Sequence, residues 1–414
     1  MLRNLKLGLL IASFGISFVA FGQIGTGELL GQDLDEVNTI TTAVPFLMIS
    51  PDSRGGGMGD AGVAASPDEN SMHYNPAKFA FIEQDMGVAI SYTPWLRNLI
   101  DDINLLYLTG YYRIRKNQVV AGSLRYFSLG NITFTDIYGS VTGNFNPNEF
   151  AFDVAYSRLL SRNLSGSIAL RYIYSNLTGG QYVGSTESHA GQAVSSDISV
   201  YYQNRVEVFK KDATFAFGVN ASNIGSKISY TENADKDFIP ANLKMGVCLT
   251  TEIDEYNSFA FMVDVNKLLV PSPPMYDDTL TQGIIIAGKD PNVAVATGIF
   301  QSFYDAPGVI RNGERRIWQE ELREFNISVG AEYWYAKQFA LRAGYFHEHA
   351  TKGNRKYFTV GMGLKLNVFG LDFSYLVPVS QRNPLENTLR FTLNFDFEGF
   401  SQQSNVSKSK VSKI

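Results

Sequence analysis

Two short motifs have residue types and spacings that could bind a cofactor or a metal ion. Residues 57–62 follow the G-x-G-x-x-G pattern of dinucleotide-binding loops, but that chemistry needs a strand before the loop and a helix after it in a βαβ unit. Pro51 and Asp52 interrupt any strand just upstream, so we interpret these glycines as turns. His347 and His349 would share one face of a strand, yet no cysteine or further histidine pairs with them in the sequence to complete a zinc site. We therefore predict no cofactor-binding and no metal-binding residues.

The nucleophilic side chains are isolated from one another. The one cysteine, Cys248, falls in a strand-like run and is interpreted as a small buried or lipid-facing apolar residue rather than a reactive thiol. His73 and His189 are single histidines among Gly, Ser and Asn, and no Ser/His/Asp set has the spacing of a nucleophile elbow. We predict no catalytic residue and conclude that the sequence does not indicate an enzyme.

Composition and charge narrow the class of protein. The 414 residues include 35 Lys and Arg against 40 Asp and Glu, a net charge of −5. No basic cluster is dense enough to suggest nucleic acid as a partner. Charged residues make up 18% and aromatic residues 13%, whereas about 25% charged residues is typical of soluble domains. This balance suits a chain whose exterior meets lipid.

The N-terminal residues are typical of a secretory signal peptide. Arg3 and Lys6 precede an apolar run from Leu7 to Phe21, and small residues stand just before Gln23. We expect cleavage there, which removes residues 1–22 and changes the net charge from −5 to −7. The apolar run is too short for a spanning helix, which needs about 20 residues. If the protein is embedded in a membrane, strands must cross it.

From Met86 to Glu398 the chain alternates apolar and polar residues in segments of roughly ten residues, as transmembrane strands do. In the last segment, Leu389, Phe391 and Leu393 would face lipid, while Arg390 and Thr392 would face the lumen. We place strands at Met86–Pro94, Asn104–Arg115, Gln118–Ser128, Glu149–Leu160, Leu164–Ser175, Asp197–Val208, Ala213–Ser222, Asn242–Thr251, Ser258–Lys267, Glu324–Tyr335, Gln338–His347, Lys356–Leu366, Val368–Val377 and Thr388–Glu398. The fold class predicted is all-β, a fourteen-stranded antiparallel transmembrane β-barrel over residues 86–398.

The connections between these strands alternate in length. Short turns alternate with long loops, the long ones being 129–148, 176–196, 223–241 and 268–323. In outer-membrane barrels the short turns lie in the periplasm and the long loops outside. We therefore expect a multi-pass protein of the cell outer membrane with exterior long loops. A soluble β-sandwich has no reason to sort its loops in this way.

The lumen of such a barrel is too wide for wall side chains alone to fill. Residues 23–85 are long enough to form an N-terminal plug, and glycines such as Gly361 and Gly363 on an inward strand face leave room for it. The candidate plug motif comprises Arg54, Gly57, Gly59, Gly62, Asn75, Pro76 and Ala77. Candidates for structural ion pairs in the lumen are Asp264, Arg342, Asp372, Arg390 and Asp396.

The loop 268–323 interrupts the repeating pattern most strongly. Apolar residues between Asn292 and Tyr304 have helix-like spacing and predict a short amphipathic helix outside the barrel. The candidate partner or cargo surface consists of Ile299, Phe300, Phe303, Tyr304 and Trp318, because exposed aromatic residues are enriched at interfaces. Packing of these residues against the barrel's own loops is the alternative.

Several of these segments resemble known families. The runs SRGGGMGDAGVA (53–64) and HYNPAKFAF (73–81) resemble the N-terminal hatch of the FadL superfamily of fourteen-stranded outer-membrane barrels. A more specific resemblance is to the PorV (LptO) family of the type IX secretion system of Bacteroidetes. It is carried by segments 301–307, 332–346, 352–357, 372–378 and 384–391. The Ser/Lys-rich residues 399–414 depart from the family, and we expect them to form a flexible periplasmic tail.

The resemblance implies a non-enzymatic carrier. PorV-like proteins pair with an SprA-type translocon, take up cargo through its type IX C-terminal domain, and hand it to an attachment complex that includes PorU. There the cargo is joined to lipopolysaccharide, so outer-membrane lipid or lipopolysaccharide is a further expected partner. The alternative is a FadL-type channel for hydrophobic small molecules, which needs a kinked strand; Pro94 and Pro378 fall only at strand ends.

Overall fold

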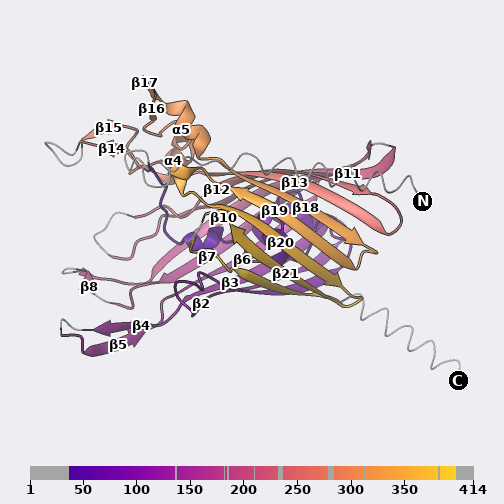
Figure 1. The fold of residues 1–414 in the computed structure, drawn as a ribbon, viewed down its shortest axis with the longest axis horizontal. Coiled ribbons are helices and arrows are strands. Elements are labelled where there is room, and N and C mark those ends of the chain that lie inside the picture. The colour runs from indigo at the N-terminus through magenta and orange to yellow at the C-terminus, as the bar shows by residue number, and fades with distance from the viewer. Residues whose placement is uncertain are drawn as a thin grey trace. The chain divides into compact units, whose positions relative to one another are not determined.

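The computed structural model describes residues 37–135, 138–180, 182–183, 186–208, 210–231, 236–277, 284–311, 314–380 and 383–397. The predicted signal peptide, residues 23–36 of the predicted plug and the predicted tail lie outside the described residues. In the described part, fourteen strands close into an antiparallel barrel (Figure 1). No described helix is both long and apolar enough to span a bilayer.

The barrel strands follow one another in chain order, and the last pairs with the first. They are β1 (Met86–Pro94), β2 (Ile103–Arg115), β3 (Gln118–Leu129), β6 (Asn148–Leu159), β7 (Leu164–Asn176), β10 (Gly191–Val208), β11 (Lys211–Gly225), β12 (Asn242–Glu252), β13 (Asn257–Leu268), β18 (Asn326–Tyr335), β19 (Phe339–His347), β20 (Lys356–Lys365), β21 (Phe369–Pro378) and β22 (Leu389–Asp396). Val88 faces Phe395 where β1 and β22 close the ring. The predicted fold class is confirmed.

Two strands differ most from their predicted lengths, each being at least five residues longer. β10 begins at Gly191 rather than Asp197, and β11 continues to Gly225. Their pairing shifts register between Ser196 and Ile198, which is the mark of a bulge. The extra residue lies in β11, where the neighbours Ser222 and Asn223 are both buried and alternation breaks, whereas buried and exposed residues still alternate in β10 from Gly191.

Side chains alternate between a buried and an exposed face along the strands. In β2, Leu105 and Tyr107 are each 1% exposed, whereas Leu106 and Leu108 are 42% and 45% exposed. Outward-facing leucines of this kind would be unfavourable in water and are favourable against hydrocarbon. The barrel therefore has the lipid-facing exterior of an outer-membrane protein.

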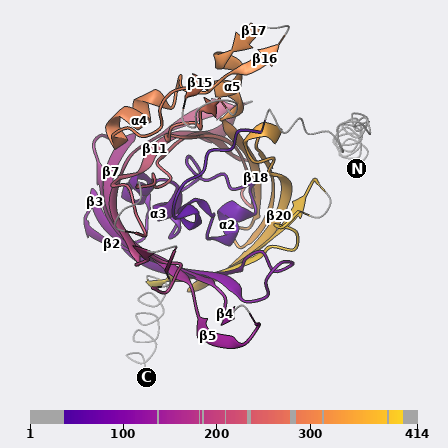
Figure 2. The ribbon, with the colours of Figure 1, turned by 90° about the vertical axis from the view of Figure 1, so that its left-hand side faces the viewer.

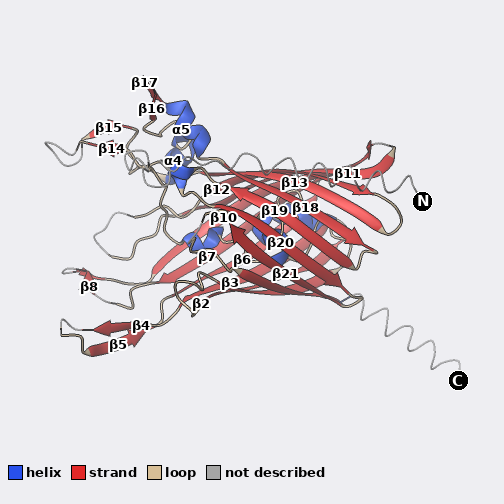
Figure 3. Cartoon of the chain, viewed as in Figure 1, coloured by secondary structure: helices blue, strands red, loops and turns tan. Residues whose placement is uncertain are grey.

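The long connections gather at one end of the barrel, here called the long-loop end, and the tight turns at the other, the short-turn end (Figures 1 and 3). The long connections carry the hairpins β4–β5 (Ile132–Thr135, Val141–Phe145), β8–β9 (Tyr182–Val183, Thr186–Glu187), β14–β15 (Met275–Tyr276, Ile285–Ala287) and β16–β17 (Val309–Arg311, Glu314–Arg316). The connection between β13 and β18, here called the insertion, also contains helices α4 (Val295–Gln301) and α5 (Ile317–Arg323).

Residues 44–82, here called the inner segment, lie within the ring of strands (Figure 2). They form four short helical pieces: η2 (Pro45–Met48), α2 (Ser53–Gly56), α3 (Ser71–Tyr74) and η3 (Pro76–Phe81). The Asp52 side chain caps α2 by accepting from the Gly55 amide, and the Asn75 side chain caps η3 by accepting from the Ala77 amide. Helices this short are not stable alone, so contacts with the barrel wall must hold them.

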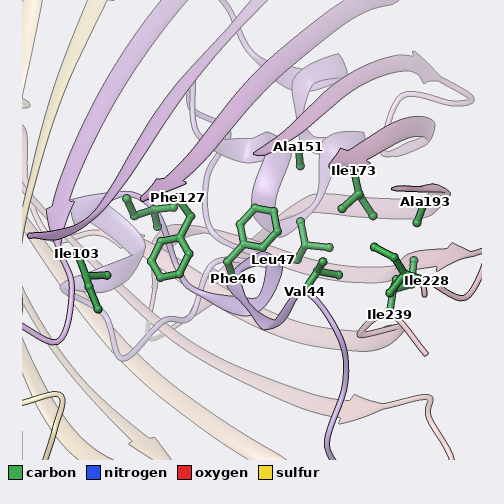
Figure 4. Packing of buried hydrophobic residues seen from close by; sticks show 11 residues of the cluster. Val44, Phe46, Leu47, Ile103, Phe127, Ala151, Ile173, Ala193, Ile228 and Ile239 are labelled. Carbon is green, nitrogen blue, oxygen red and sulfur yellow. The ribbon is translucent and has the colours of Figure 1, made fainter. Parts of the chain in front are cut away.

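An apolar cluster joins the start of the inner segment to the wall. Val44, Phe46 and Leu47 pack against wall residues that include Phe127 and Ile173 (Figure 4). The rings of Phe46 and Phe127 are stacked with centroids 6.1 Å apart. Apolar side chains therefore fill this part of the lumen.

Candidate functional site

The inner segment is fixed to the wall by a chain of buried charges, here called the charge network: Asp68, Arg54, Glu332, Arg342 and Asp372. Arg54 on α2 donates from Nε and Nη2 to the two carboxylate oxygens of Glu332, at 2.9 and 2.8 Å. Its Nη1 lies 2.9 Å from Oδ2 of Asp68. A bidentate arginine–carboxylate pair fixes orientation as well as distance.

Arg342 continues the network along the wall. Its Nε donates to Glu332 at 2.8 Å and its Nη1 to Asp372 at 2.5 Å. The sequence pattern identified Arg342 and Asp372 but missed Glu332. The signal was present, because Glu332 and Arg342 are directly opposite each other on β18 and β19, where opposite charges pair favourably.

Two of the other predicted lumen charges also contact the inner segment. The Asp264 carboxylate on β13 accepts from the amides of Gly62 and Val63, at 2.6 and 2.9 Å. Arg390 on β22 lies 3.4 Å from the Asp60 carboxylate. These charges bind the inner segment, so their role is structural in this conformation.

Glycines allow the inner segment to approach the wall closely. Gly59 has a φ of +68°, a conformation that favours glycine. A Cβ atom on Gly344 of β19 would overlap the backbone of Gly59 and Met58, and one on Gly330 of β18 would lie 2.7 Å from the Met58 carbonyl oxygen. Of the two glycines named from the sequence, Gly361 approaches the inner segment, since its Cβ would lie 3.2 Å from the Cα of Gly57, whereas a Cβ on Gly363 would meet the wall side chains of Asp372 and Arg342.

The remaining residues of the predicted motif form hydrogen bonds on the opposite side of the lumen. The Asn75 amide donates to the carbonyls of Val63 and Val200, at 3.2 and 3.0 Å. The carbonyl oxygen of Pro76 accepts from Ser157 at 2.8 Å, and that of Ala77 accepts from Ser165 at 2.7 Å. Main-chain groups of the inner segment are thus satisfied by wall hydroxyls.

A cavity of about 310 Å³ lies beside the charge network at the short-turn end. Its lining combines network residues such as Arg54 and Glu332 with Trp334 of β18. The Arg342 guanidinium stands over the Trp334 ring, 5.6 Å from its centroid. The inner segment therefore leaves space at this end of the lumen.

The structure separates the five aromatic and apolar candidates of the insertion. The predicted helix is present as α4, but it is shorter than the run 292–304. Ile299 packs against a small buried cluster that includes Leu269. Phe300 is 72% exposed and Tyr304 51% exposed, while Phe303, Tyr304 and Trp318 border a shallow groove. Four of the five candidates are thus at the surface.

Helix α5 has its acidic face buried. Lys352 lies 2.7 Å from Glu320 and 3.1 Å from Glu324. Lys267, at the end of β13, lies 2.5 Å from Glu324 and 3.3 Å from Glu321. The carboxylates and lysines are 1–8% exposed. Sequence reasoning missed both lysines, because they lie outside the insertion, Lys267 on β13 and Lys352 in the connection between β19 and β20.

The same cluster contains a carboxyl with an altered proton affinity. Asp305 accepts from the Ser272 amide at 3.2 Å. Burial, together with the nearby Glu321, raises the pKa of Asp305 from 3.8 to about 6. Burial also raises the pKa of Glu321. Burial at the base of the insertion therefore favours the neutral form of both carboxyls.

The motifs considered for cofactor and metal chemistry have structural partners. Gly57 follows α2, a helix of four residues, and not the strand of a βαβ unit. His349 caps η4 (Ala350–Lys352) by accepting from the Thr351 amide. Among the residues that the structure describes, no group of three or more His, Cys, Asp or Glu side chains could hold a metal ion.

Comparisons with known proteins give a family and a set of similar folds. The family model described as type IX secretion system protein PorV matches residues 32–275. The solved structure of the Pseudomonas putida toluene transporter TodX is 10% identical with a TM-score of 0.46, covering 82% of this chain and 95% of that one. That of a Pseudomonas aeruginosa FadL homologue is 11% identical with a TM-score of 0.40, covering 87% and 100%. No protein with a curated description matches the chain.

Proposed function

Because the chain belongs to the PorV family of the type IX secretion system, we propose that it is the outer-membrane carrier that takes up cargo at the translocon and hands it over at the cell surface. The family match carries this proposal, since it spans the inner segment and the first nine barrel strands. In this scheme the long-loop end is exterior, and the short-turn end and both termini are periplasmic.

The partners proposed follow from membership of the family. They are an SprA-type translocon, cargo proteins with type IX C-terminal domains, the attachment complex that includes PorU, and outer-membrane lipopolysaccharide. The exposed aromatic residues of the insertion support a protein-binding role, since Phe300 is 72% exposed on α4. Aromatic side chains are enriched among residues that dominate protein interfaces. We assign Phe300, Phe303 and Tyr304 to the surface for the translocon or cargo.

We further propose that the inner segment is a plug that keeps the lumen closed to solutes. The charge network, the hydrogen bonds to Asp264 and the apolar contacts of Phe46 support this role. The cavity at the short-turn end favours the alternative, a channel for hydrophobic small molecules. Passage through the barrel would require the inner segment to move, and that requirement disfavours the channel.

Affinity purification of the tagged protein from its own outer membrane tests the proposal. We expect a very large barrel and proteins that share a C-terminal domain to be recovered. The double variant Phe300→Asp with Phe303→Asp should lose these partners and impair cargo release at the surface. Tyr138→Asp is the matched control, because Tyr138 is 86% exposed in a different loop.

Two results would contradict the proposal. Unchanged secretion and unchanged recovery of the translocon with the double variant would show that Phe300 and Phe303 do not form the surface for the translocon or cargo. Detergent-resistant fatty acid in the purified protein, without any large barrel or cargo, would favour the channel instead. In both cases the barrel must still assemble, which is checked by its heat-modifiable migration on gels.

A further inference from the structure

Part of the insertion projects sideways from the barrel. Hairpin β16–β17 and helix α5, here called the overhang, lie outside the ring of strands at the long-loop end in both views (Figures 1 and 2). A loop that served only to cover the lumen would lie over the ring. The overhang instead extends beyond the barrel wall, on the side where the membrane lies.

The surface that the overhang presents is apolar. Ile317, Trp318 and Leu322 are 46%, 60% and 59% exposed, whereas Glu320 and Glu321 of the same helix are buried against lysines. This is the reverse of a surface helix in water, which buries its apolar face and exposes its charges. Contiguous exposed apolar side chains on a folded protein indicate a binding surface.

This apolar face continues the lipid-facing wall. Helix α5 ends at Arg323 and strand β18 begins at Asn326, so the two ends are at most about 11 Å apart along the chain. The first outward side chain of β18, Ile327, is 41% exposed on the lipid-facing surface. The end of α5 therefore lies at the membrane boundary of the barrel.

Cationic side chains border the same face. Arg315 and Arg316 directly precede Ile317 and Trp318, and the side chain of Arg316 is 36% exposed with the nearest carboxylate, Glu314, at 3.6 Å. Tryptophan and arginine beside aliphatic residues are typical of segments that lie in the membrane interface and bind anionic headgroups. A glycolipid with phosphate groups offers both an acyl region and an anionic headgroup.

We propose that the overhang docks into the outer leaflet of the membrane, with Trp318 and Leu322 among the acyl chains and Arg316 at the phosphates of the glycolipid. This inference rests on the proposed exterior position of the long loops. Trp318 borders one groove with Phe303 and Tyr304, and its position on α5 assigns it to lipid. The buried lysine–carboxylate pairs hold α5 in this orientation. Docking of α5 in the membrane would therefore set the tilt of the insertion relative to the membrane and the position at which α4 meets a protein partner.

Fluorescence quenching in vesicles tests the proposal with the full-length protein. Cys248, which is buried, is changed to Ala, and a single cysteine is introduced as Leu322→Cys and labelled with a polarity-sensitive nitrobenzoxadiazole dye. Ile327→Cys is the lipid-facing reference, and Tyr138→Cys and Phe300→Cys are the aqueous references. The vesicles contain phosphatidylcholine with a spin-labelled lipid, either alone or with purified lipopolysaccharide mixed into both leaflets.

We expect the dye at position 322 to emit at shorter wavelength and to be quenched by the spin label at least half as strongly as the dye at position 327. Lipopolysaccharide should increase the quenching, and Arg316→Gln should abolish that increase. Because both leaflets have the same composition, the result does not depend on the direction of insertion.

Quenching at position 322 equal to that at position 138 would overturn the proposal. So would a dye that is shielded only after the translocon is added, which would make the overhang a protein-binding surface. Quenching that lipopolysaccharide does not change would overturn the assignment of the anionic headgroup. Strong quenching in a protein that recovers no cargo would instead count against the proposed secretion function alone.

Discussion

The guanidinium of Arg54 and the carboxylate of Glu332 are joined by two parallel hydrogen bonds of 2.9 and 2.8 Å, although 278 residues separate them. One residue belongs to the inner segment and the other to strand β18 on the wall. Both side chains are at most 10% exposed. This pair therefore links the inner segment directly to the barrel wall.

Arg54→Ala should destabilise the protein strongly. Removal of one partner from a buried ion pair costs about 3–5 kcal/mol, and we expect the lower part of this range because Glu332 keeps Arg342. Urea unfolding in detergent measures the change. Arg162→Ala, in an exposed turn, is the control and should leave the midpoint unchanged. Equal shifts for the two variants would show that the pair does not hold the inner segment.

Gly344→Ala should prevent the inner segment from seating against β19. The added methyl group would overlap backbone atoms of Gly59 and Met58, and such overpacking costs about 1–3 kcal/mol. We expect ion conductance in planar bilayers to rise as the lumen opens. Gly370→Ala is the matched control, because the nearest atom to its added methyl would be 3.5 Å away. If Gly344→Ala conducts no more than Gly370→Ala, the close approach does not seal the lumen.

Lys352→Met should loosen the insertion without unfolding the barrel. The change removes two ion pairs, at 2.7 and 3.1 Å, and takes the lysine partner from buried Glu320, whereas Glu324 keeps Lys267. Trypsin should then cut faster after Arg315, Arg316 and Arg323, while heat-modifiable migration on gels stays normal. Lys116→Met, at an exposed turn of the other end, should not change the cleavage. Cleavage of both variants at the wild-type rate would mean that the cluster does not support α5.

The stability of the insertion should fall as the pH rises from about 4 to about 6. Asp305 has a pKa of about 6 in the folded protein against an ordinary 3.8, so the folded form binds its proton more tightly than the unfolded form. Such a group favours folding below its ordinary pKa and loses that contribution as the pH passes its folded value. Glu321, whose pKa is also raised, acts in the same direction.

Asp305→Asn is the test of this pH dependence. Asparagine resembles the neutral carboxyl, so tryptic cleavage of the insertion in the variant should change less between pH 5 and pH 7 than in the wild type. Asp290→Asn, at a more exposed position in the same insertion, is the control and should keep the wild-type profile. If Asp305→Asn leaves the pH dependence of tryptic cleavage unchanged, another group is responsible for that dependence.

Apolar and polar residues that alternate with a period of two were sufficient to predict the barrel strands, because this alternation depends only on which face of a strand meets lipid. Strand β1 spans Met86–Pro94 as predicted, and β22 carries the predicted run from Leu389. Strand β11 was placed too short, since a bulge at Ser222 and Asn223 breaks the period. The inner segment has no period, so its helices could not be placed from the sequence.

The sequence by itself determined the number of strands, the lipid-facing side chains and the position of the insertion, because each is a local consequence of residue order. The tertiary structure decided which charges meet. Glu332 faces Arg342 on the next strand, but its second partner, Arg54, reaches it from the inner segment. The acidic face of α5 is buried because Lys267 comes from β13 and Lys352 from the connection between β19 and β20. Pairing of buried charges depends on residues distant in the chain, so no local pattern could show that the apolar face of α5 is the exposed one.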